Sequence, residues 1–295
     1  MSDPVEAALG EHGIDVRVRS RRSLGGGCIH DVERIELEDG RAFVAKCNHR
    51  RAASAFEEER AGLEALDRTR TVLVPKPLGV SRVGERAVFL LEALEPADSV
   101  SSDVWRRFGV ELAALHAAGG YDRYGFDHDN HVGATSQPNP WTRDWVEFNR
   151  EHRIGHQVRL AERAGLLRGA ERRSLERLVE RLDRILPARP RPSLLHGDLW
   201  SGNALPVRVA DGGVRVALID PAVSVGDGWA DIAMMQLFGG FPESCHRAYA
   251  EAQDDQDRVE ERLGVYRLYH VLNHLNLFGR SYAARAVAIA DALCP

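Results

Sequence analysis

Residues 194–203, LLHGDLWSGN, carry polar side chains in an order that suits phosphoryl transfer. Asp198 supplies a carboxylate and Asn203 an amide, and the apolar segment 214–219 leads to a second carboxylate at Asp220. Phosphoryl transfer needs one residue to orient or deprotonate the attacking hydroxyl, and hard oxygen ligands to hold Mg²⁺ on the phosphates. We therefore predict that Asp198 is the general base and that Asn203 and Asp220 bind Mg²⁺. The alternative is a polar turn in which Asp198 caps a backbone amide.

The spacing of these residues matches that of protein kinases, which use H-R-D-x-x-x-x-N followed later by Asp-Phe-Gly. Here residues 196–198 read His-Gly-Asp, Asn203 keeps the spacing, and residues 220–222 read Asp-Pro-Ala. Upstream, Lys46 ends the segment Phe-Val-Ala-Lys, which corresponds to the kinase Val-Ala-Ile-Lys. We expect Lys46 to pair with the α- and β-phosphates of a nucleotide and with Glu59 on the following helix. The alternative is a solvated lysine near a helix glutamate.

A glycine-rich turn, GGGCIH at residues 25–30, lies between the first two predicted strands. Its backbone amides could cover phosphates, but it lacks the P-loop pattern and the last glycine of Gly-x-Gly-x-x-Gly, so a flexible hairpin is the alternative. The thiol of Cys28 is either a packed side chain or a redox switch that moves the turn away from the nucleotide. The nucleotide-binding residues predicted in this turn are Gly25, Gly26, Gly27, Cys28 and Ile29.

The run LLHGDLWSGN together with IDPA resembles the fructosamine kinase (ketosamine 3-kinase) family, a branch of the kinase-like phosphotransferases that includes aminoglycoside and choline kinases. The Leu-Trp-Ser-Gly insert at 199–202 and the Gly-Phe-Asp-x-Asp-Asn run at 125–130 narrow the resemblance to this branch. Other landmarks extend over nearly the whole chain, at residues 25–29, 43–46, 56–63, 138–141, 144–145 and 237–241.

The resemblance implies an α+β, bilobal, protein-kinase-like fold. A small antiparallel-sheet lobe at residues 1–93 would bind the nucleotide, and a larger, mainly helical lobe at residues 94–295 would hold the catalytic and substrate residues. It implies ATP and Mg²⁺ as cofactors, and phosphorylation of fructosamines or related ketosamines at the sugar O3, a repair role. We also predict nucleotide contacts at Glu92 and Leu94, and support of the catalytic loop by His196 and Asp231. The predicted substrate contacts are Trp200, whose aromatic face can stack on a sugar ring, Ser201 and Trp229.

Hydrophobic periodicity predicts the elements that must position these residues. Strands are predicted before residue 93 at 16–19, 32–37, 42–47, 78–80 and 87–92. One helix is predicted after the strand at 42–47, and Ser54 and Glu57 form a capping-box pattern at its start. Helices dominate the rest of the chain and are predicted at 104–119, 145–166, 170–186, 231–237, 259–276 and 282–292.

One segment departs from the family pattern. Where members commonly read Asp-Pro-Ala-x-aromatic-aromatic-Gly-His-Arg-Glu, residues 224–229 read SVGDGW, without the Arg-Glu pair. The segment follows a predicted Mg²⁺ ligand, so we expect it to border the acceptor pocket and to shift specificity. The alternatives are an aminoglycoside- or choline-type kinase and, from another class, a catalytically silent nucleotide-binding regulator. The intact set of kinase residues argues against the silent regulator.

Composition excludes several other classes of protein. The net charge of −5, with both signs interspersed, does not suit a nucleic-acid backbone. The four cysteines lack the spacing of zinc ligands, and their low number fits a reducing cytosol. The His/Asp cluster at 127–131 could suggest a metal site, but the family resemblance implies a structural loop there. No run approaches the roughly 20 apolar residues that span a bilayer. We expect a soluble, cytoplasmic monomer or homodimer that acts on free or protein-bound ketosamines, without nucleic-acid or membrane partners.

Overall fold

The computed structural model describes residues 3–25 and 30–294, and the chain divides into two compact units. Unit 1 comprises Met1–Val104 and Gly202–Pro221, and unit 2 comprises Trp105–Ser201 and Ala222–Pro295. Each unit is therefore built from two stretches of sequence, whereas the sequence predicts one boundary at residue 93. No helix among the described residues is long and apolar enough to cross a membrane.

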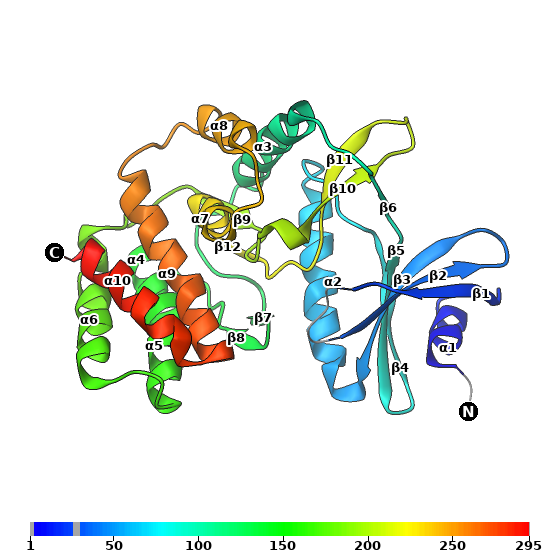
Figure 1. Ribbon diagram of the computed structural model, residues 1–295, viewed down its shortest axis with the longest axis horizontal. Helices are drawn as coiled ribbons and strands as arrows, with labels where there is room; N and C mark the ends of the chain where they lie inside the picture. Colours follow the sequence, from blue (N-terminus) through cyan, green and yellow to red (C-terminus); the bar gives the residue numbers. More distant parts are fainter. Residues whose placement is uncertain (1–2, 26–29, 295) are drawn as a thin grey trace. The chain divides into compact units, whose positions relative to one another are not determined.

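Unit 1 contains a five-stranded antiparallel sheet (Figure 1). All the strands predicted before residue 93 are present, although the first begins at Val18 rather than at residue 16. In spatial order the strands are β1 (Val18–Ser23), β2 (Asp31–Leu37), β3 (Ala42–His49), β5 (Arg86–Glu92) and β4 (Pro77–Val83).

A helix packs against each face of this sheet. On one face, α1 (Pro4–Glu11) buries Leu9 in a core that includes Ala45 of β3. On the other face, α2 (Ala53–Arg68) packs the Phe56 ring against Phe89 of β5. Because side chains alternate along a strand, the residue after Ala45, which is Lys46, points toward α2.

The two helix starts in unit 1 differ from what the sequence predicts. The α1 helix was not predicted from the sequence. It begins at Pro4 and is capped by Asp3, whose Oδ1 accepts the Val5 N–H at 2.8 Å. The predicted capping box at Ser54 is wrong. A 3₁₀ turn, Arg50–Ala52, leads directly into α2, so Ser54 lies inside the helix and no side chain caps it.

A hairpin from the second stretch of unit 1 forms a separate three-stranded sheet. It comprises β10 (Ala204–Arg208) and β11 (Val214–Leu218), and β10 also pairs with β6 (Glu95–Pro96). This pairing ties residues 202–221 to unit 1. The hairpin brings its two ends together, because the Ile219 N–H donates to the Asn203 carbonyl oxygen at 3.1 Å.

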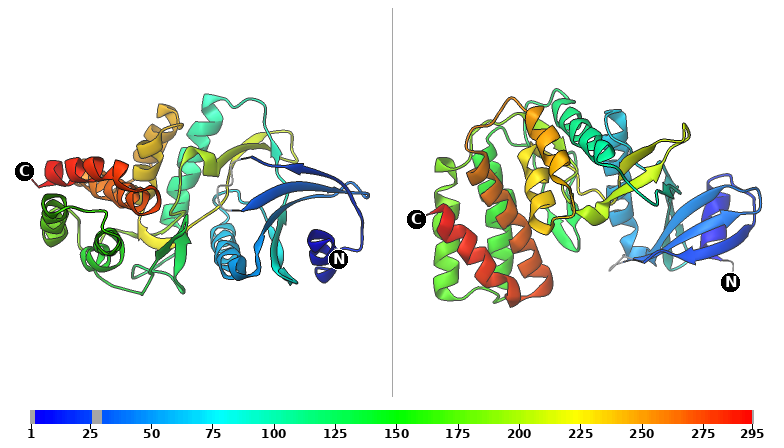
Figure 2. Two further views of the ribbon diagram at one scale, coloured as in Figure 1. Left: turned by 60° about the horizontal axis from the view of Figure 1, so that its bottom comes forward. Right: turned by 45° about the horizontal axis from the view of Figure 1, so that its top comes forward.

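Helices dominate unit 2, as the sequence predicts. Four of them, α5, α6, α9 and α10, pack side by side (Figure 2). The α8 helix was not predicted. The helices are α3 (Ser102–Ala117), α4 (Trp145–Phe148), α5 (Ile154–Arg163), α6 (Gly169–Glu180), α7 (Trp229–Phe238), α8 (Glu243–Glu251), α9 (Val259–Phe278) and α10 (Ala283–Leu293).

The single helix predicted at 145–166 is interrupted. A π-helical turn, Asn149–Arg153, separates α4 from α5, and such turns occur where a helix accommodates an extra residue. The backbone is crowded here, since a Cβ on Gly155 would lie 1.8 Å from the Arg150 carbonyl oxygen. The turn leaves the Arg153 side chain buried inside unit 2.

Unit 2 also contains two short antiparallel strand pairs. In one, β7 (Asn130–Val132) pairs with β8 (Thr135–Gln137); in the other, β9 (Pro192–Leu195) pairs with β12 (Ser224–Asp227). All four residues of β12 are buried. The segment that departs from the family pattern is therefore, over these four residues, a buried strand that pairs with the strand leading into the catalytic loop.

The buried imidazole of His270 on α9 generates a prediction about stability. Burial lowers the pKa of His270 to about 3, so the folded protein keeps this ring neutral while the unfolded chain protonates it near pH 6.5. The unfolded state therefore binds the extra proton below pH 6.5. We expect the free energy of unfolding to fall by about 2 kcal/mol between pH 6.5 and pH 5 on this account. Urea denaturation at the two pH values should show that His270→Gln removes this part of the loss; an unchanged pH dependence contradicts it.

Candidate active site

Lys46 is the centre of a buried polar cluster in unit 1. Its Nζ donates a hydrogen bond to Glu59 Oε1 on α2 at 2.7 Å and another to Asp220 Oδ1, just after β11. The Lys46 side chain is only 8% exposed. The ion pair predicted between Lys46 and Glu59 is confirmed, and Asp220 joins it, which the sequence did not predict.

Opposing effects set the charges of this cluster. Burial by itself lowers the pKa of Lys46, but the carboxylates of Glu59 and Asp220 outweigh it and raise that pKa above its usual value. Burial raises the pKa of Glu59 to about 7, against the opposing charge of Lys46. Lys46 is therefore an ammonium ion, which suits anionic phosphate oxygens.

Asp220 and Asn203 offer hard oxygen atoms in the same unit. The Asp220 side chain is 47% exposed, so one face of its carboxylate is open to a ligand. Its backbone φ of 53° lies in the left-handed region, which non-glycine residues rarely adopt and aspartate tolerates better than most. Asn203 is buried, and its carbonyl oxygen accepts the N–H of Ile219, the residue before Asp220. One carboxylate and one amide oxygen fit the preference of Mg²⁺ for oxygen ligands completed by phosphate and water.

The other residues predicted to bind the nucleotide are only partly described. Gly25 lies in a turn after β1, whereas Gly26, Gly27, Cys28 and Ile29, and with them the proposed redox switch, lie outside the described residues. Their roles stay predictions.

Glu92 and Leu94 at the end of the five-stranded sheet are described in full. The Glu92 N–H donates to the Lys76 carbonyl oxygen at 2.8 Å, and the Leu94 carbonyl accepts from Arg34 Nη1 at 3.5 Å. These bonds use one backbone group of each residue within unit 1. Their contacts with a nucleotide stay predictions.

In unit 2, Asp231 anchors the loop that carries Asp198. The Asp231 side chain comes from the first turn of α7, and its Oδ2 accepts the His196 N–H at 2.8 Å. Its Oδ1 accepts the next N–H, that of Gly197, at 2.9 Å. One buried carboxylate thus holds two consecutive peptide groups, which is the support predicted for Asp231.

A second layer of hydrogen bonds fixes the Asp231 carboxylate itself. His116 Nε2 lies 3.2 Å from Asp231 Oδ2, and His116 Nδ1 lies 2.9 Å from the Tyr249 hydroxyl. Burial raises the pKa of Asp231, but the hydrogen bond and charge of His116 and the backbone donors outweigh it, so the pKa lies below its usual value. Asp231 is therefore ionised, and His116 is a buried, hydrogen-bonded histidine that holds it.

The structure explains why the middle residue of the His-Gly-Asp triplet is glycine. Gly197 has a φ of 84°, and a Cβ at this position would lie 2.0 Å from the Ala222 carbonyl oxygen. The Ala222 N–H donates to the His196 carbonyl at 2.9 Å, and the Asp198 N–H donates to His196 Nδ1 at 3.3 Å. His196 thus holds the loop by hydrogen bonds, and the loop passes so close to residue 222 that only glycine fits.

Three buried amide side chains form a network that sequence reasoning did not assign. Gln137 Nε2 donates to the Ala222 carbonyl at 3.1 Å, and Asn130 Nδ2 donates to the Val223 carbonyl at 2.8 Å. Asn130 Oδ1 in turn accepts from Gln137 Nε2 at 2.8 Å and from Asn139 Nδ2 at 3.0 Å. The network therefore fixes the backbone that directly follows Asp220-Pro221.

Two large buried side chains hold this network in turn. Tyr269 on α9 donates to Gln137 Oε1 at 2.7 Å, and Arg153 Nη2 donates to Asn139 Oδ1 at 2.6 Å. Burial raises the pKa of Tyr269, against the opposing charge of Arg153. The sequence did carry a signal for two of these amides, because Asn130 and Asn139 lie in the family landmarks at residues 125–130 and 138–141, whereas Gln137 lies outside them.

The loop at 127–131 uses its polar side chains within the fold. Asp129 Oδ1 accepts the Asn139 N–H at 2.7 Å, and Asp127 Oδ1 accepts from Trp141 Nε1 at 3.3 Å. These bonds are the ones expected of the structural loop that the family resemblance implies.

The predicted substrate contacts differ in exposure. Trp200 is 41% exposed, so its ring is available to a ligand, and Ser201 lies against Gly240, where a Cβ would come within 2.5 Å of the serine Cβ. Trp229 is only 6% exposed, and its Nε1 donates to the Asp255 carbonyl oxygen at 3.1 Å. The indole of Trp229 is thus buried in the core of unit 2, and almost none of its surface is exposed for the predicted contact with substrate.

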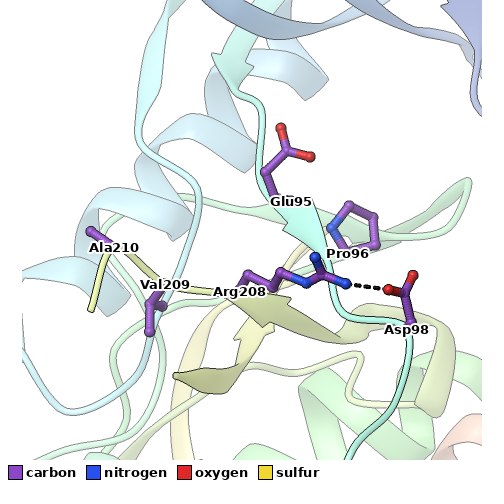
Figure 3. Close-up of a pocket in the computed structure, with 6 residues that line it drawn as sticks. All are labelled: Glu95, Pro96, Asp98, Arg208, Val209 and Ala210. Carbon is purple, nitrogen blue, oxygen red and sulfur yellow. Dashed lines mark hydrogen bonds and ion pairs between the residues drawn. The ribbon is translucent and has the colours of Figure 1, made fainter. Parts of the chain in front are cut away.

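A surface pocket of about 540 Å³ lies elsewhere in unit 1 (Figure 3). Its walls come from β6 and from the end of β10, and the Arg208 guanidinium points across it to pair with Asp98. None of its lining residues is a predicted site residue. They are Glu95, Pro96, Asp98, Arg208, Val209 and Ala210.

Comparison with known proteins explains this combination of residues. The sequence model of the family described as fructosamine kinase matches residues 2–294. The chain belongs to the fructosamine kinase family. A probable ketoamine kinase from Synechocystis is 39% identical over 93% of this chain and 90% of its own length. A chloroplastic protein-ribulosamine 3-kinase from Oryza sativa is 36% identical over 98% of this chain and 83% of its own length.

Solved structures show the same fold for this fructosamine kinase family member. A candidate fructosamine-3-kinase from Haemophilus somnus has a TM-score of 0.87 and 28% identity, and covers 99% of this chain and 97% of its own. An aminoglycoside phosphotransferase has a TM-score of 0.63 at 16% identity over 97% of this chain and 96% of its own, which shows likeness of fold alone. The predicted family and the predicted α+β, protein-kinase-like fold are confirmed.

The close approach of Gly197 to Ala222 predicts the effect of one added methyl group. Gly197→Ala should place its Cβ against the Ala222 carbonyl, displace the loop that carries Asp198, and lower kinase turnover by about 10² or more. Gly212→Ala is the matched control, because Gly212 has a similar φ of 82° with open space around it. The control should lose about 1–2 kcal/mol of unfolding free energy and keep its activity. Equal turnover of the two variants would refute the steric argument.

Proposed function

We propose that this protein transfers the γ-phosphoryl group of ATP, in the presence of Mg²⁺, to the sugar O3 of a ketosamine. The single observation that carries the proposal is the buried ammonium of Lys46 held by Glu59 and Asp220, in a chain of this family. This arrangement supports a functional nucleotide site and argues against a catalytically silent regulator.

In this proposal the residues of unit 1 hold the nucleotide. Lys46 binds the α- and β-phosphate oxygens through its ammonium group, and Glu59 keeps that ammonium in place from α2. When bound, Mg²⁺ would be held by Asn203 and Asp220 and would neutralise phosphate charge.

The residues of unit 2 act on the acceptor. The Asp198 carboxylate orients the sugar hydroxyl and accepts its proton as the oxygen attacks the γ-phosphorus. Asp231 and Gly197 hold Asp198 in position through the loop backbone. The exposed face of Trp200 offers a surface on which a sugar ring can stack.

The relatives of this chain, rather than the shape of its site, support the class of acceptor. Relatives are named ketoamine kinases and protein-ribulosamine 3-kinases, which supports ketosamines, free or on proteins, as acceptors of this chain. Oligomeric state and the predicted cytoplasmic location stay predictions.

A panel of acceptors tests the proposal most directly. Purified protein, Mg²⁺ and ATP would be mixed with a fructosamine, a ribulosamine, an aminoglycoside or choline, and ADP release would be followed together with the mass of the acceptor. We expect phosphate on the ketosamines alone. Preferred turnover of an aminoglycoside or of choline would replace the proposal with the rival small-molecule kinase, and no turnover of any acceptor would favour the regulator.

Asp198→Asn tests the assignment of the base. The substitution keeps the size of the side chain and removes its ability to accept a proton, so kcat should fall by about 10² or more. Affinity for Mg·ATP should stay close to that of the wild type, because the loss falls on the transition state. Turnover near the wild-type value would remove Asp198 from its role.

Asp220→Ala separates the metal site from the base. Loss of one oxygen ligand should weaken Mg²⁺-dependent nucleotide binding, measured by calorimetric titration with Mg·ATP. Asp98→Ala is the matched control, since Asp98 is also an ion-paired aspartate of unit 1 but lines the pocket of Figure 3. If both variants bind Mg·ATP like the wild type, the assignment of Asp220 is wrong.

A further inference from the structure

Lysine is almost absent from this chain. Lys and Arg together number 39, and Lys46 and Lys76 are the only lysines among them. Side-chain amines react with the carbonyl group of reducing sugars when they are neutral, whereas an arginine guanidinium stays protonated. The chain therefore presents sugars with two side-chain amines.

These two amines have opposite environments. The Lys46 side chain is 8% exposed, and its Nζ is enclosed by Glu59 and Asp220, so a sugar carbonyl has no access to it. Lys76 is exposed, in the segment just before β4. Any reaction with a sugar at a lysine side chain should therefore occur at Lys76.

Two hydrogen bonds join the backbone of Lys76 to Glu92. The Lys76 carbonyl accepts the Glu92 N–H at 2.8 Å, and the Lys76 N–H donates to Glu92 Oε2 at 3.1 Å. Pro75 and Pro77 on either side restrict the backbone further. The Glu92 carboxylate is thus held at the backbone of the residue that carries the exposed amine.

We propose that Lys76 is a glycation site of this protein, where an open-chain aldose or aldose phosphate forms a ketosamine with Glu92 as the local base. The neutral Nζ adds to the aldehyde carbon, and loss of water gives an imine. The Glu92 carboxylate removes the proton from sugar C2 of the protonated imine, which gives an enaminol. One proton is then taken up at C1 and the hydroxyl proton is released, so the imine isomerises to a 1-amino-1-deoxy-2-ketose without oxidant or reductant.

This inference deepens the proposed function and rests on it for its meaning. The adduct at Lys76 belongs to the class of compounds proposed as substrate, so the protein would itself carry such a group. Meanwhile burial keeps the same sugars from Lys46, the amine that the proposed reaction needs. The formation of the adduct does not require kinase activity, so the two proposals can fail separately.

The test is to incubate the full-length protein with D-ribose in the absence of ATP and to map adducts by mass spectrometry of peptides after dialysis. We expect a stable adduct on the peptide with Lys76, none on the peptide with Lys46, and no lysine adduct in Lys76→Arg. Glu92→Gln keeps an acceptor for the Lys76 N–H but loses the base. It should lower ketosamine formation at Lys76 at least about tenfold, while imine trapped by cyanoborohydride stays unchanged.

Arg22→Lys in β1 provides the matched comparison. Arg22 is exposed, so this variant adds an amine that is open to sugars but lies outside the Pro-Lys-Pro segment. Its adduct should accumulate more slowly than that of Lys76. An unmodified Lys76, an adduct at Lys46 of equal yield, an unaffected Glu92→Gln or an equally fast Arg22→Lys adduct would each overturn the proposal.

Discussion

The carboxylate of Asp231, buried under the His196–Gly197 peptides, is the interaction on which the catalytic loop depends. A buried charge is costly unless it is well paired, and here two backbone donors and the ring of His116 supply the partners. The carboxylate in return holds two successive peptide groups in one orientation. That orientation gives Gly197 its left-handed conformation and sets the direction in which the next residue, Asp198, leaves the loop.

The backbone after Asp220 is held by a second, independent set of polar groups. The amides of Asn130 and Gln137 bind the carbonyls of residues 222 and 223, and Tyr269 and Arg153 hold those amides from the helices of unit 2. Side-chain amides buried with their hydrogen bonds satisfied favour one conformation over others. The segment that follows the predicted metal ligand is therefore fixed in place by the folded structure itself.

Residues 224–229, which depart from the family pattern, form buried polar contacts within unit 2. Asp227 Oδ2 accepts from Arg262 Nη2 at 2.7 Å and from the Tyr266 hydroxyl at 2.5 Å, and Arg262 is 1% exposed. Removing one partner of such a buried pair typically costs about 3–5 kcal/mol, because the other charge is left unpaired. Asp227 thus joins β12 to α9, and Trp229 at the end of the segment packs on Tyr249.

Local patterns in the sequence were sufficient for the five-stranded sheet of unit 1, for most helices of unit 2 and for the spacing of Asp198, Asn203 and Asp220. Alternation, helical periodicity and motif spacing are properties of neighbouring residues. They did not indicate α8 or the π-helical turn between α4 and α5. The contact of Lys46 with Asp220, the burial of Trp229 and the amide network depended on tertiary structure. Each joins side chains that are far apart in the chain, and no local pattern records which of them will meet. Gly197 illustrates both kinds of information. The sequence shows that a glycine stands in the His-Gly-Asp triplet, but only the folded chain, with the Ala222 carbonyl against it, explains why no larger residue fits.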